Sequence, residues 1–162
     1  MKILALDPGT FETGLVIINE EYELLKKEIV INALLLDRIK TLEYDRVIIE
    51  MVASYGMPVG KTTFNTVLTI GRIYQEAKRL KKMPTLITRQ AVKKVLCFSM
   101  KAKDSNVNQA VKDLYEPTGG GADPYKGTKK QSGPLYGMKS HMWAALALGI
   151  AFFRGAEHYD YV

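Results

Sequence analysis

The sequence predicts an α/β fold in which a five-stranded mixed sheet is flanked by helices. Three strand-like apolar runs follow one another near the N-terminus, and later strand-like runs alternate with segments of helical spacing. Two of the apolar runs end in a carboxylate, Asp7 and Glu50. Parallel strands place functional residues at their carboxyl ends, so this pattern favours a layered α/β domain with a site at one edge of its sheet.

Five segments have the composition of strands. They are residues 2–7, 13–19, 22–31, 46–50 and 84–87. The first ends at the turn signal Pro8-Gly9, and the close succession of the first three predicts an antiparallel meander. The fourth and fifth are expected to run parallel to the first.

Five segments have the spacing of helices. They are residues 33–42, 62–82, a helix capped by Thr88 that runs to Leu96, a helix capped by Asp104 or Ser105, and residues 141–153 capped by Ser140. The long helix carries apolar residues down one side, at Phe64, Val67, Leu68, Gly71, Tyr74 and Ala77. That side is expected to pack on the sheet, with pairing to a second copy as the alternative. The last helix is apolar nearly all round and is expected to be buried.

Length and composition predict a single domain over residues 1–162, with a long Gly- and Lys-rich loop at 117–139. The lone cysteine, Cys97, excludes an intrachain disulfide and fits an intracellular protein. An acid at position 7 interrupts the N-terminal apolar stretch, which argues against a signal peptide. The apolar run at 142–153 is shorter than the ~20 residues that span a bilayer. We therefore expect a cytoplasmic protein with no membrane partner.

Positive charge is concentrated in the middle of the chain. The net charge is +6, and residues 72–130 alone hold fourteen Lys and Arg against five acidic residues. This asymmetry suggests a polyanionic partner, although a solvated basic face is an equally simple interpretation.

Asp7 and Glu50 are the first candidates for chemistry. Neighbouring parallel strands lie ~4.8 Å apart, so two carboxylates at their ends can share a divalent ion. Phosphodiester cleavage uses such ions to activate water and to stabilise the leaving oxygen. His141, at the start of the last helix, can bind metal or transfer a proton. The simpler interpretations are a turn-forming aspartate, an edge glutamate and a capping histidine.

Three blocks of the sequence resemble a known family. LALDPGTFETGLVII, RVIIE and SHMWAALALGIAF look like the catalytic blocks of RuvC-type crossover-junction endonucleases, particularly the bacteriophage members. The segment ITRQAVKKVLCFSMKAKDSNVNQAVKDLY resembles the part of the family that leads into its DNA-facing helices. The resemblance implies an RNase H-like fold, a homodimer, two Mg²⁺ or Mn²⁺ ions and paired nicks in Holliday junctions and other branched DNA.

The resemblance also implies roles for single residues. Asp7, Glu50 and His141 match catalytic, metal-binding positions. Ala144 stands where the family has its last metal-binding aspartate. The chain is then an inactivated variant, or takes its last ligand elsewhere, for instance from Asp123, or binds junctions without cutting them.

DNA contacts are expected from the basic central region. The resemblance implies that DNA phosphates are contacted by Arg89, Lys93, Lys101 and Lys103. The Gly-rich loop offers a clamp on a DNA arm through Lys126, Lys129 and Lys130, and Tyr55 is a candidate for stacking on an unpaired base.

Other functions share parts of these patterns. Sugar-kinase and actin-like ATPases also begin with a strand followed by Asp-x-Gly-Thr, but they need two lobes. An RNA-processing nuclease of the same fold and a junction-binding protein without cleavage are the nearer alternatives. Metal-dependent nicking of branched DNA separates these from a resolvase.

Overall fold

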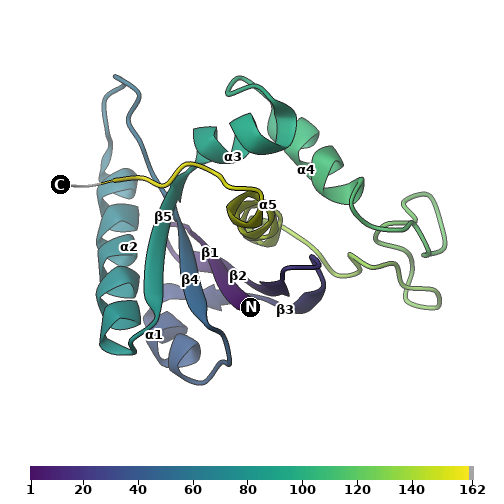
Figure 1. The fold of residues 1–162 in the computed structure, drawn as a ribbon, viewed down its shortest axis with the longest axis horizontal. Coiled ribbons are helices and arrows are strands. Elements are labelled where there is room, and N and C mark those ends of the chain that lie inside the picture. The colour runs from purple at the N-terminus through teal and green to yellow at the C-terminus, as the bar shows by residue number, and fades with distance from the viewer. Residues whose placement is uncertain (161–162) are drawn as a thin grey trace.

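The computed structural model describes residues 1–160 and contains the mixed five-stranded sheet that the sequence predicts (Figure 1). The strands are β1 (Lys2–Pro8), β2 (Glu12–Asn19), β3 (Leu24–Ile31), β4 (Arg46–Met51) and β5 (Met83–Thr88). Their order across the sheet is β3-β2-β1-β4-β5. The pairs β1–β2 and β2–β3 are antiparallel, whereas β1–β4 and β4–β5 are parallel. The predicted meander and the predicted parallel half are both confirmed.

Five helices complete the described part of the chain. They are α1 (Asn32–Lys40), α2 (Lys61–Arg79), α3 (Arg89–Cys97), α4 (Asp104–Lys112) and α5 (His141–Phe153). Thr88 caps α3 as predicted, because its hydroxyl accepts a hydrogen bond from the amide of Ala91 at 3.3 Å. The predicted cap of α4 was wrong, because the cap position is Lys103, whose amide donates to the side chain of Asn106. Ser140 stands at the cap position of α5 as predicted, although its side chain makes no capping hydrogen bond.

Helices cover both faces of the sheet and create two cores. α1 and α2 lie on one face, and α5 lies on the other with α3 and α4 outside it (Figure 1). Alternate residues of β1 divide between the two cores, with Leu4 and Leu6 on the α1–α2 side and Ile3 and Ala5 on the α5 side. This period of two is the signature of a sheet that is buried on both faces.

The packed side of α2 differs from the sequence-based assignment. Ile70, Ile73 and Ala77 are buried against the sheet, whereas Phe64 and Leu68 are exposed. Gly71 also faces open space. The helix carries two apolar stripes, and the β-branched stripe is the one that the sheet buries. The predicted side was therefore wrong for Phe64, Val67, Leu68 and Gly71, and right for Tyr74 and Ala77.

α5 lies unusually close to the sheet. A Cβ on Gly149 would stand 2.8 Å from Cδ1 of Ile18 and 3.3 Å from the Cβ of Ala5. A larger residue at position 149 would force Ile18 to shift, and the nearly continuous apolar surface of α5 is buried as predicted. The depth of α5 brings its N-terminus to the carboxyl ends of the parallel strands.

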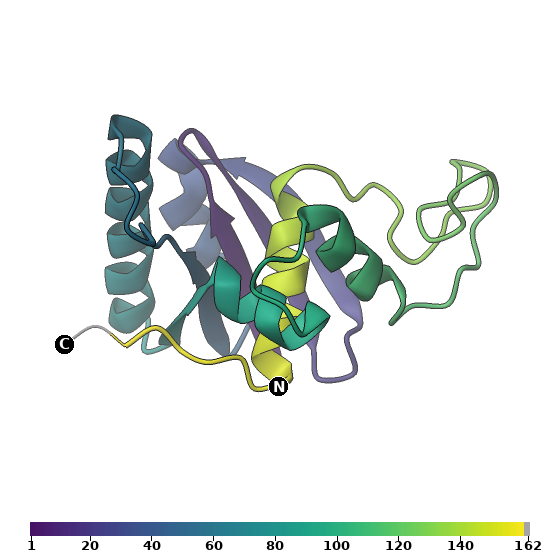
Figure 2. The same ribbon diagram turned by 90° about the horizontal axis from the view of Figure 1, so that it is seen from above.

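The long loop at 117–139 extends away from the sheet (Figures 1 and 2). It has no helix or strand of its own, as predicted, but it is tightly wound. Gly127 has φ +74°, and a Cβ there would stand 2.4 Å from the carbonyl oxygen of Gln131. At its base, the ammonium groups of Lys126 and Lys112 lie 5.4 and 6.0 Å from the centre of the Trp143 ring.

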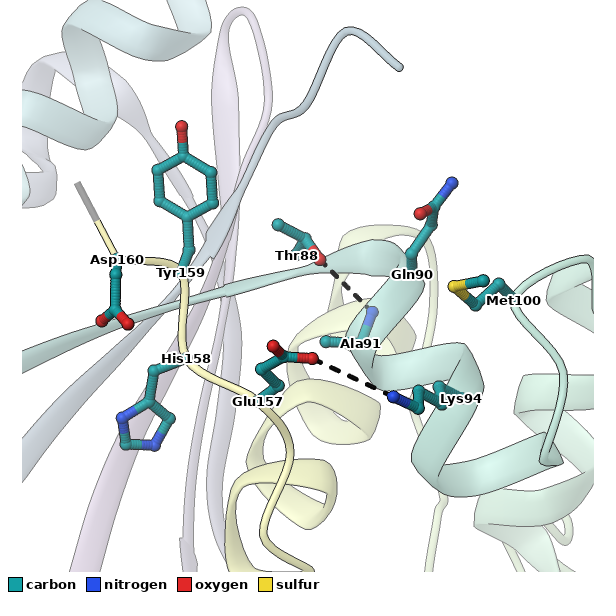
Figure 3. A pocket seen from close by; sticks show the side chains of 9 residues that line it. All are labelled: Thr88, Gln90, Ala91, Lys94, Met100, Glu157, His158, Tyr159 and Asp160. Carbon is teal, nitrogen blue, oxygen red and sulfur yellow. Dashed lines mark hydrogen bonds and ion pairs between the residues drawn. The ribbon is translucent and has the colours of Figure 1, made fainter.

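The C-terminal segment runs beside the outer edge of β5. The amide of Tyr159 donates to the carbonyl oxygen of Leu86 at 2.7 Å. Between this segment and α3 is a hollow of about 310 Å³, where Glu157 pairs with Lys94 at 4.0 Å (Figure 3). Within residues 1–160, no helix has both the length and the apolar character needed to cross a membrane.

Candidate active site

Asp7 and Glu50 lie side by side at the carboxyl ends of two parallel strands. Leu6 of β1 is paired with Ile49 of β4, so the next residue of each strand is one of the two carboxylates. Their side chains keep only 16% and 15% of their exposure. Two largely buried carboxylates repel each other unless a cation or a proton lies near them.

His141 approaches Asp7 from the start of α5. Its Nδ1 lies 2.7 Å from Oδ2 of Asp7. Two glycines make room for this contact. A Cβ on Gly14 would stand 2.3 Å from the backbone carbonyl of His141, and a Cβ on Gly9 would stand 3.0 Å from its Nε2. Gly9 therefore lies against the imidazole, and Gly14 lies against the backbone of His141.

The turn after Asp7 is held by hydrogen bonds from α1. The side-chain amide of Asn32 donates to the carbonyl oxygen of Gly9 at 2.9 Å. The buried hydroxyl of Thr13 donates to the side-chain oxygen of Asn32 at 2.7 Å. Because each of these polar groups has a partner, the turn that carries Gly9 is fixed in place.

Glu50 belongs to a second group of charged side chains. The guanidinium of Arg89 donates to Oε2 of Glu50 at 3.4 Å and to Oδ1 of Asp104 at 3.0 Å. Nζ of Lys93, one turn further along α3, lies 3.4 Å from the same oxygen of Asp104. Arg89 thus connects β4 to the first residue of α4.

The pKa values of Glu50 and Asp104 are shifted in opposite directions. Burial of Glu50 and the nearby charge of Asp7 raise its pKa to about 8, although Arg89 opposes the rise. Burial acts to raise the pKa of Asp104 as well, but its hydrogen bond and ion pair with Arg89 outweigh that effect and lower it. A deprotonated Glu50 therefore needs more positive charge than Arg89 alone supplies.

These side chains line one open cleft of about 500 Å³. Its wall is formed by Asp7, Glu50, Arg89, Asp104, Asn108, Ser140, His141, Trp143 and Ala144. His141 and Ala144 share the wall, as their spacing of three residues on a helix predicts. Asp104 and Asn108 were missed as site residues. Nothing in their local pattern distinguishes a cleft residue from an ordinary helix start, because only the packing of α4 beside Arg89 brings them here.

The predicted DNA-contacting residues fall into three groups. Arg89 lies inside the cleft, and Lys93 is paired with Asp104 at its edge. Lys101, Lys103, Lys129 and Lys130 are exposed on the α3–α4 connection and on the long loop. Tyr55 is exposed and lines a hollow that shares Glu50 and Arg89 with the cleft.

Two further residues of the long loop were candidates for the site. Asp123 was considered as a replacement ligand, but it pairs with Lys112 at 2.8 Å and does not line the cleft. Lys126, considered part of a clamp on DNA, has its ammonium 5.4 Å from the centre of the ring of Trp143, which lines the cleft. Asp104, rather than Asp123, is the additional carboxylate of the cleft.

The donor chemistry of the cleft fits a divalent cation. Carboxylate oxygens are the ligands that Mg²⁺ and Mn²⁺ prefer, and Asp7, Glu50 and Asp104 all contribute them to this wall. The positive charge now in contact with two of them is the guanidinium of Arg89. Within residues 1–160, no three His, Cys, Asp or Glu side chains form a ready-made metal cluster.

Solved structures share the whole architecture. A structure of RuvC from Thermus thermophilus superposes with a TM-score of 0.68 at 18% sequence identity, covering 94% of this chain and 94% of that chain. The chain has a RuvC-like fold. A structure of T. thermophilus RuvC in complex with a Holliday junction substrate gives a TM-score of 0.67 at 17% identity, covering 93% of this chain and 92% of that one. No protein family and no curated protein matches the sequence. The RuvC-like fold belongs to the RNase H-like class, so the predicted fold class is confirmed.

Proposed function

We propose that this chain is a metal-dependent endonuclease of the crossover-junction type, which resolves Holliday junctions and other branched DNA by paired nicks. One observation carries the proposal. The RuvC-like fold brings Asp7, Glu50 and His141 from three distant segments into a single cleft. The sequence blocks that contain these residues look most like those of bacteriophage members, and we propose that type.

Asp7, Glu50 and Asp104 would hold Mg²⁺ or Mn²⁺. Two such ions, when bound, activate a water and stabilise the leaving oxygen of a phosphodiester. Asp104 supplies a carboxylate that position 144 lacks, because both residues line the same cleft. In the proposed ligand set the third carboxylate therefore comes from α4, whereas the family pattern places it in α5, at the position of Ala144.

His141 lies beside the proposed metal ligands and has a role of its own. When its Nδ1–H donates to Asp7, its Nε2 carries the lone pair and can take a proton from water. The carboxylate of Asp7 orients the ring and stabilises the imidazolium that forms. The 2.7 Å contact supports a role for His141 as general base, with direct metal binding through Nε2 as the alternative.

DNA would lie across the carboxyl end of the sheet. Lys101 and Lys103 are exposed beside the cleft on the α3–α4 connection, and Lys129 and Lys130 are exposed on the extended loop. Such side chains bind phosphates without reading sequence. Tyr55, which lines the hollow next to the cleft, would stack on a base that the junction leaves unpaired.

A second copy of the chain would complete the enzyme, because paired nicks need two clefts. The outer side of α2 presents Phe64 and Leu68 at 58% and 68% exposure, with Gly71 open beside them. An apolar stripe of this kind is expensive to leave in water, and Gly71 lets a second helix come close. We propose a homodimer that packs through this side of α2.

The dimer proposal is tested by sedimentation velocity. Leu68→Glu should convert a dimer to a monomer, because it places a charge in the centre of the stripe. Thr62→Glu, which adds the same charge on another exposed side of α2, should leave the dimer intact. A parent chain that sediments as a monomer at micromolar concentration contradicts the proposal.

Cleavage of a labelled synthetic four-way junction with Mg²⁺ or Mn²⁺ tests the proposed activity. The parent chain is compared with Ala144→Asp and Asp104→Asn, and linear duplex and RNA of matched sequence serve as control substrates. Symmetric nicks by the parent that weaken in Asp104→Asn support the proposal. Preferential cutting of the RNA instead identifies an RNA-processing nuclease.

The alanine at position 144 favours a second candidate function, in which the protein binds junctions without cutting them. An alanine at this position of the wall binds no metal. Tight junction binding without nicks, with nicks restored by Ala144→Asp, would identify a disabled resolvase.

A further inference from the structure

We propose that Arg89 is a movable cation that closes the cleft in the DNA-free protein. A phosphate of the DNA backbone draws it away, and its departure frees Glu50 and Asp104 for a divalent metal. The inference rests on the proposed function and deepens it. It assigns to this chain a coupling between substrate binding and metal binding.

The position of Arg89 is unfavourable for its own helix. Arg89 is the first residue of α3, and the first turn of α3 contains no acidic residue. The N-terminus of a helix carries partial positive charge and disfavours a cation there. The guanidinium is therefore held by carboxylates from other elements, Glu50 of β4 and Asp104 of α4.

Arg89 and a metal ion compete for the same oxygens. The guanidinium contacts Oε2 of Glu50 and Oδ1 of Asp104, which are two of the three carboxylates in the cleft wall. A divalent ion bound to Glu50 would stand within a few Å of a fixed positive charge, and that repulsion weakens its binding. Tight metal binding therefore requires Arg89 to leave.

Arg89 can exchange its carboxylate partners for a phosphate. Its bond to Glu50 is long, at 3.4 Å, and its side chain keeps 24% of its exposure, so an incoming anion can reach it. A guanidinium matches a phosphate as well as it matches a carboxylate, through two parallel N–H donors. Asp104 lies at the N-terminus of α4, where negative charge is favourable, and it stays in place when Arg89 departs.

Neighbouring charges place a phosphate at this point of the cleft. Lys93 lies one turn along α3 and is also held by Asp104. Lys101 and Lys103 are exposed on the connection that leads to Asp104. DNA that contacts these lysines brings its backbone to the edge of the cleft, within reach of Arg89.

The coupling is reciprocal. If bound DNA removes a competitor of the metal, it raises the metal affinity, and bound metal raises the DNA affinity by the same factor. We expect a factor of roughly ten, within the usual range for coupled sites. The chain would then bind little metal until DNA is in place, which confines cleavage to the complex.

Mn²⁺ binding to the full chain, measured by electron paramagnetic resonance, tests the inference without using cleavage. Four proteins are compared in the absence of DNA: the parent, Arg89→Gln, Arg89→Lys and Lys93→Gln. Arg89→Gln should bind Mn²⁺ roughly ten-fold more tightly than the parent. Arg89→Lys should also bind it more tightly, because lysine keeps the charge but cannot bridge two carboxylates with a planar fork.

Lys93→Gln is the matched control. It removes one positive charge that touches Asp104 but not Glu50. If Lys93→Gln and Arg89→Gln strengthen Mn²⁺ binding equally while Arg89→Lys equals the parent, only overall charge matters and the inference is overturned. Circular dichroism confirms that each variant is folded.

The second measurement repeats the titration with a DNA duplex whose binding is verified by fluorescence anisotropy. The parent should gain about ten-fold in Mn²⁺ affinity, and Arg89→Gln should gain almost nothing. An unchanged parent overturns the inference, while junction cleavage measured separately still supports the proposed function. If none of the four proteins binds Mn²⁺ at millimolar concentrations, the proposed metal site fails, and the inference fails with it.

Discussion

The two halves of the cleft are built in different ways. Asp7 and His141 form one half, where the backbone of Gly14 lies so close to α5 that a Cβ would stand 2.3 Å from the carbonyl of His141. Glu50, Arg89 and Asp104 form the other half, where side chains from β4, α3 and α4 meet through ion pairs of 3.0 and 3.4 Å.

The difference has a physical consequence. A backbone contact in a packed core has one arrangement, because any movement opens a void or produces a clash. The bond from Arg89 to Glu50 is long, at 3.4 Å, and Asp104 is largely exposed, so these side-chain contacts can rearrange more easily than packed backbone. The Asp7 half is therefore pre-organised for chemistry, and the Glu50 half can respond to substrate.

The largest effect is expected when Asp7, in the pre-organised half of the cleft, is replaced. Asp7→Asn should lower the rate of junction cleavage by more than about 100-fold, because groups that only orient metal ligands already contribute 10- to 100-fold. Asp104→Asn should lower it about ten-fold, since Asp7 and Glu50 remain. Single-turnover rates measure both, and anisotropy in EDTA should show that metal-free junction binding changes little. Undiminished cleavage by Asp7→Asn would remove that residue from the mechanism.

The backbone contact itself is tested by Gly14→Ala. The new Cβ collides with the backbone of His141, which should lower the free energy of unfolding by about 3 kcal/mol. Gly60→Ala is the control, because Gly60 has a φ of −91° and a Cβ there meets only open space. As a change at the cap position of α2, it should lower the free energy of unfolding by at most about 1 kcal/mol. Urea unfolding compares the two, and equal effects would show that the close approach is not a constraint.

The smallest expected effect concerns Glu50, in the half of the cleft that is held by ion pairs. The pKa of Glu50 is about 8 in the folded protein, above the 4.5 of an ordinary glutamate, so the folded state holds this proton more tightly. Ionisation of Glu50 therefore lowers the free energy of unfolding as the pH rises from 4.5 to about 8. Glu50→Gln removes that loss and should stabilise the metal-free protein at pH 8, with little gain at pH 4.5.

Glu76→Gln provides a control of opposite sign. The hydrogen bond from Arg79 lowers the pKa of Glu76, so its carboxylate stabilises the fold above the ordinary pKa of a glutamate. Its replacement should destabilise the protein slightly at neutral pH. Thermal unfolding in EDTA across this pH range measures both variants. A Glu50→Gln gain that does not grow with pH contradicts the raised pKa.

Local patterns were sufficient where one face of an element was unambiguous. The alternation in β1 and the apolar surface of α5 each permit only one kind of burial, and both were predicted correctly. α2 has two apolar stripes, and its sequence does not say which one the sheet will bury. Its orientation depends on the neighbouring β4 and β5, and the prediction was wrong for Phe64 and Leu68.

The sequence by itself determined the strands, the helices and the positions of Asp7, Glu50 and His141, because strand ends and helix starts are written in short-range patterns. The tertiary structure alone decided that Asp104 joins them and that Asp123 does not. It also decided that Arg89 bridges two carboxylates. These contacts depend on how α3 and α4 pack beside α5, and that packing is set by long-range contacts between elements rather than by any local spacing.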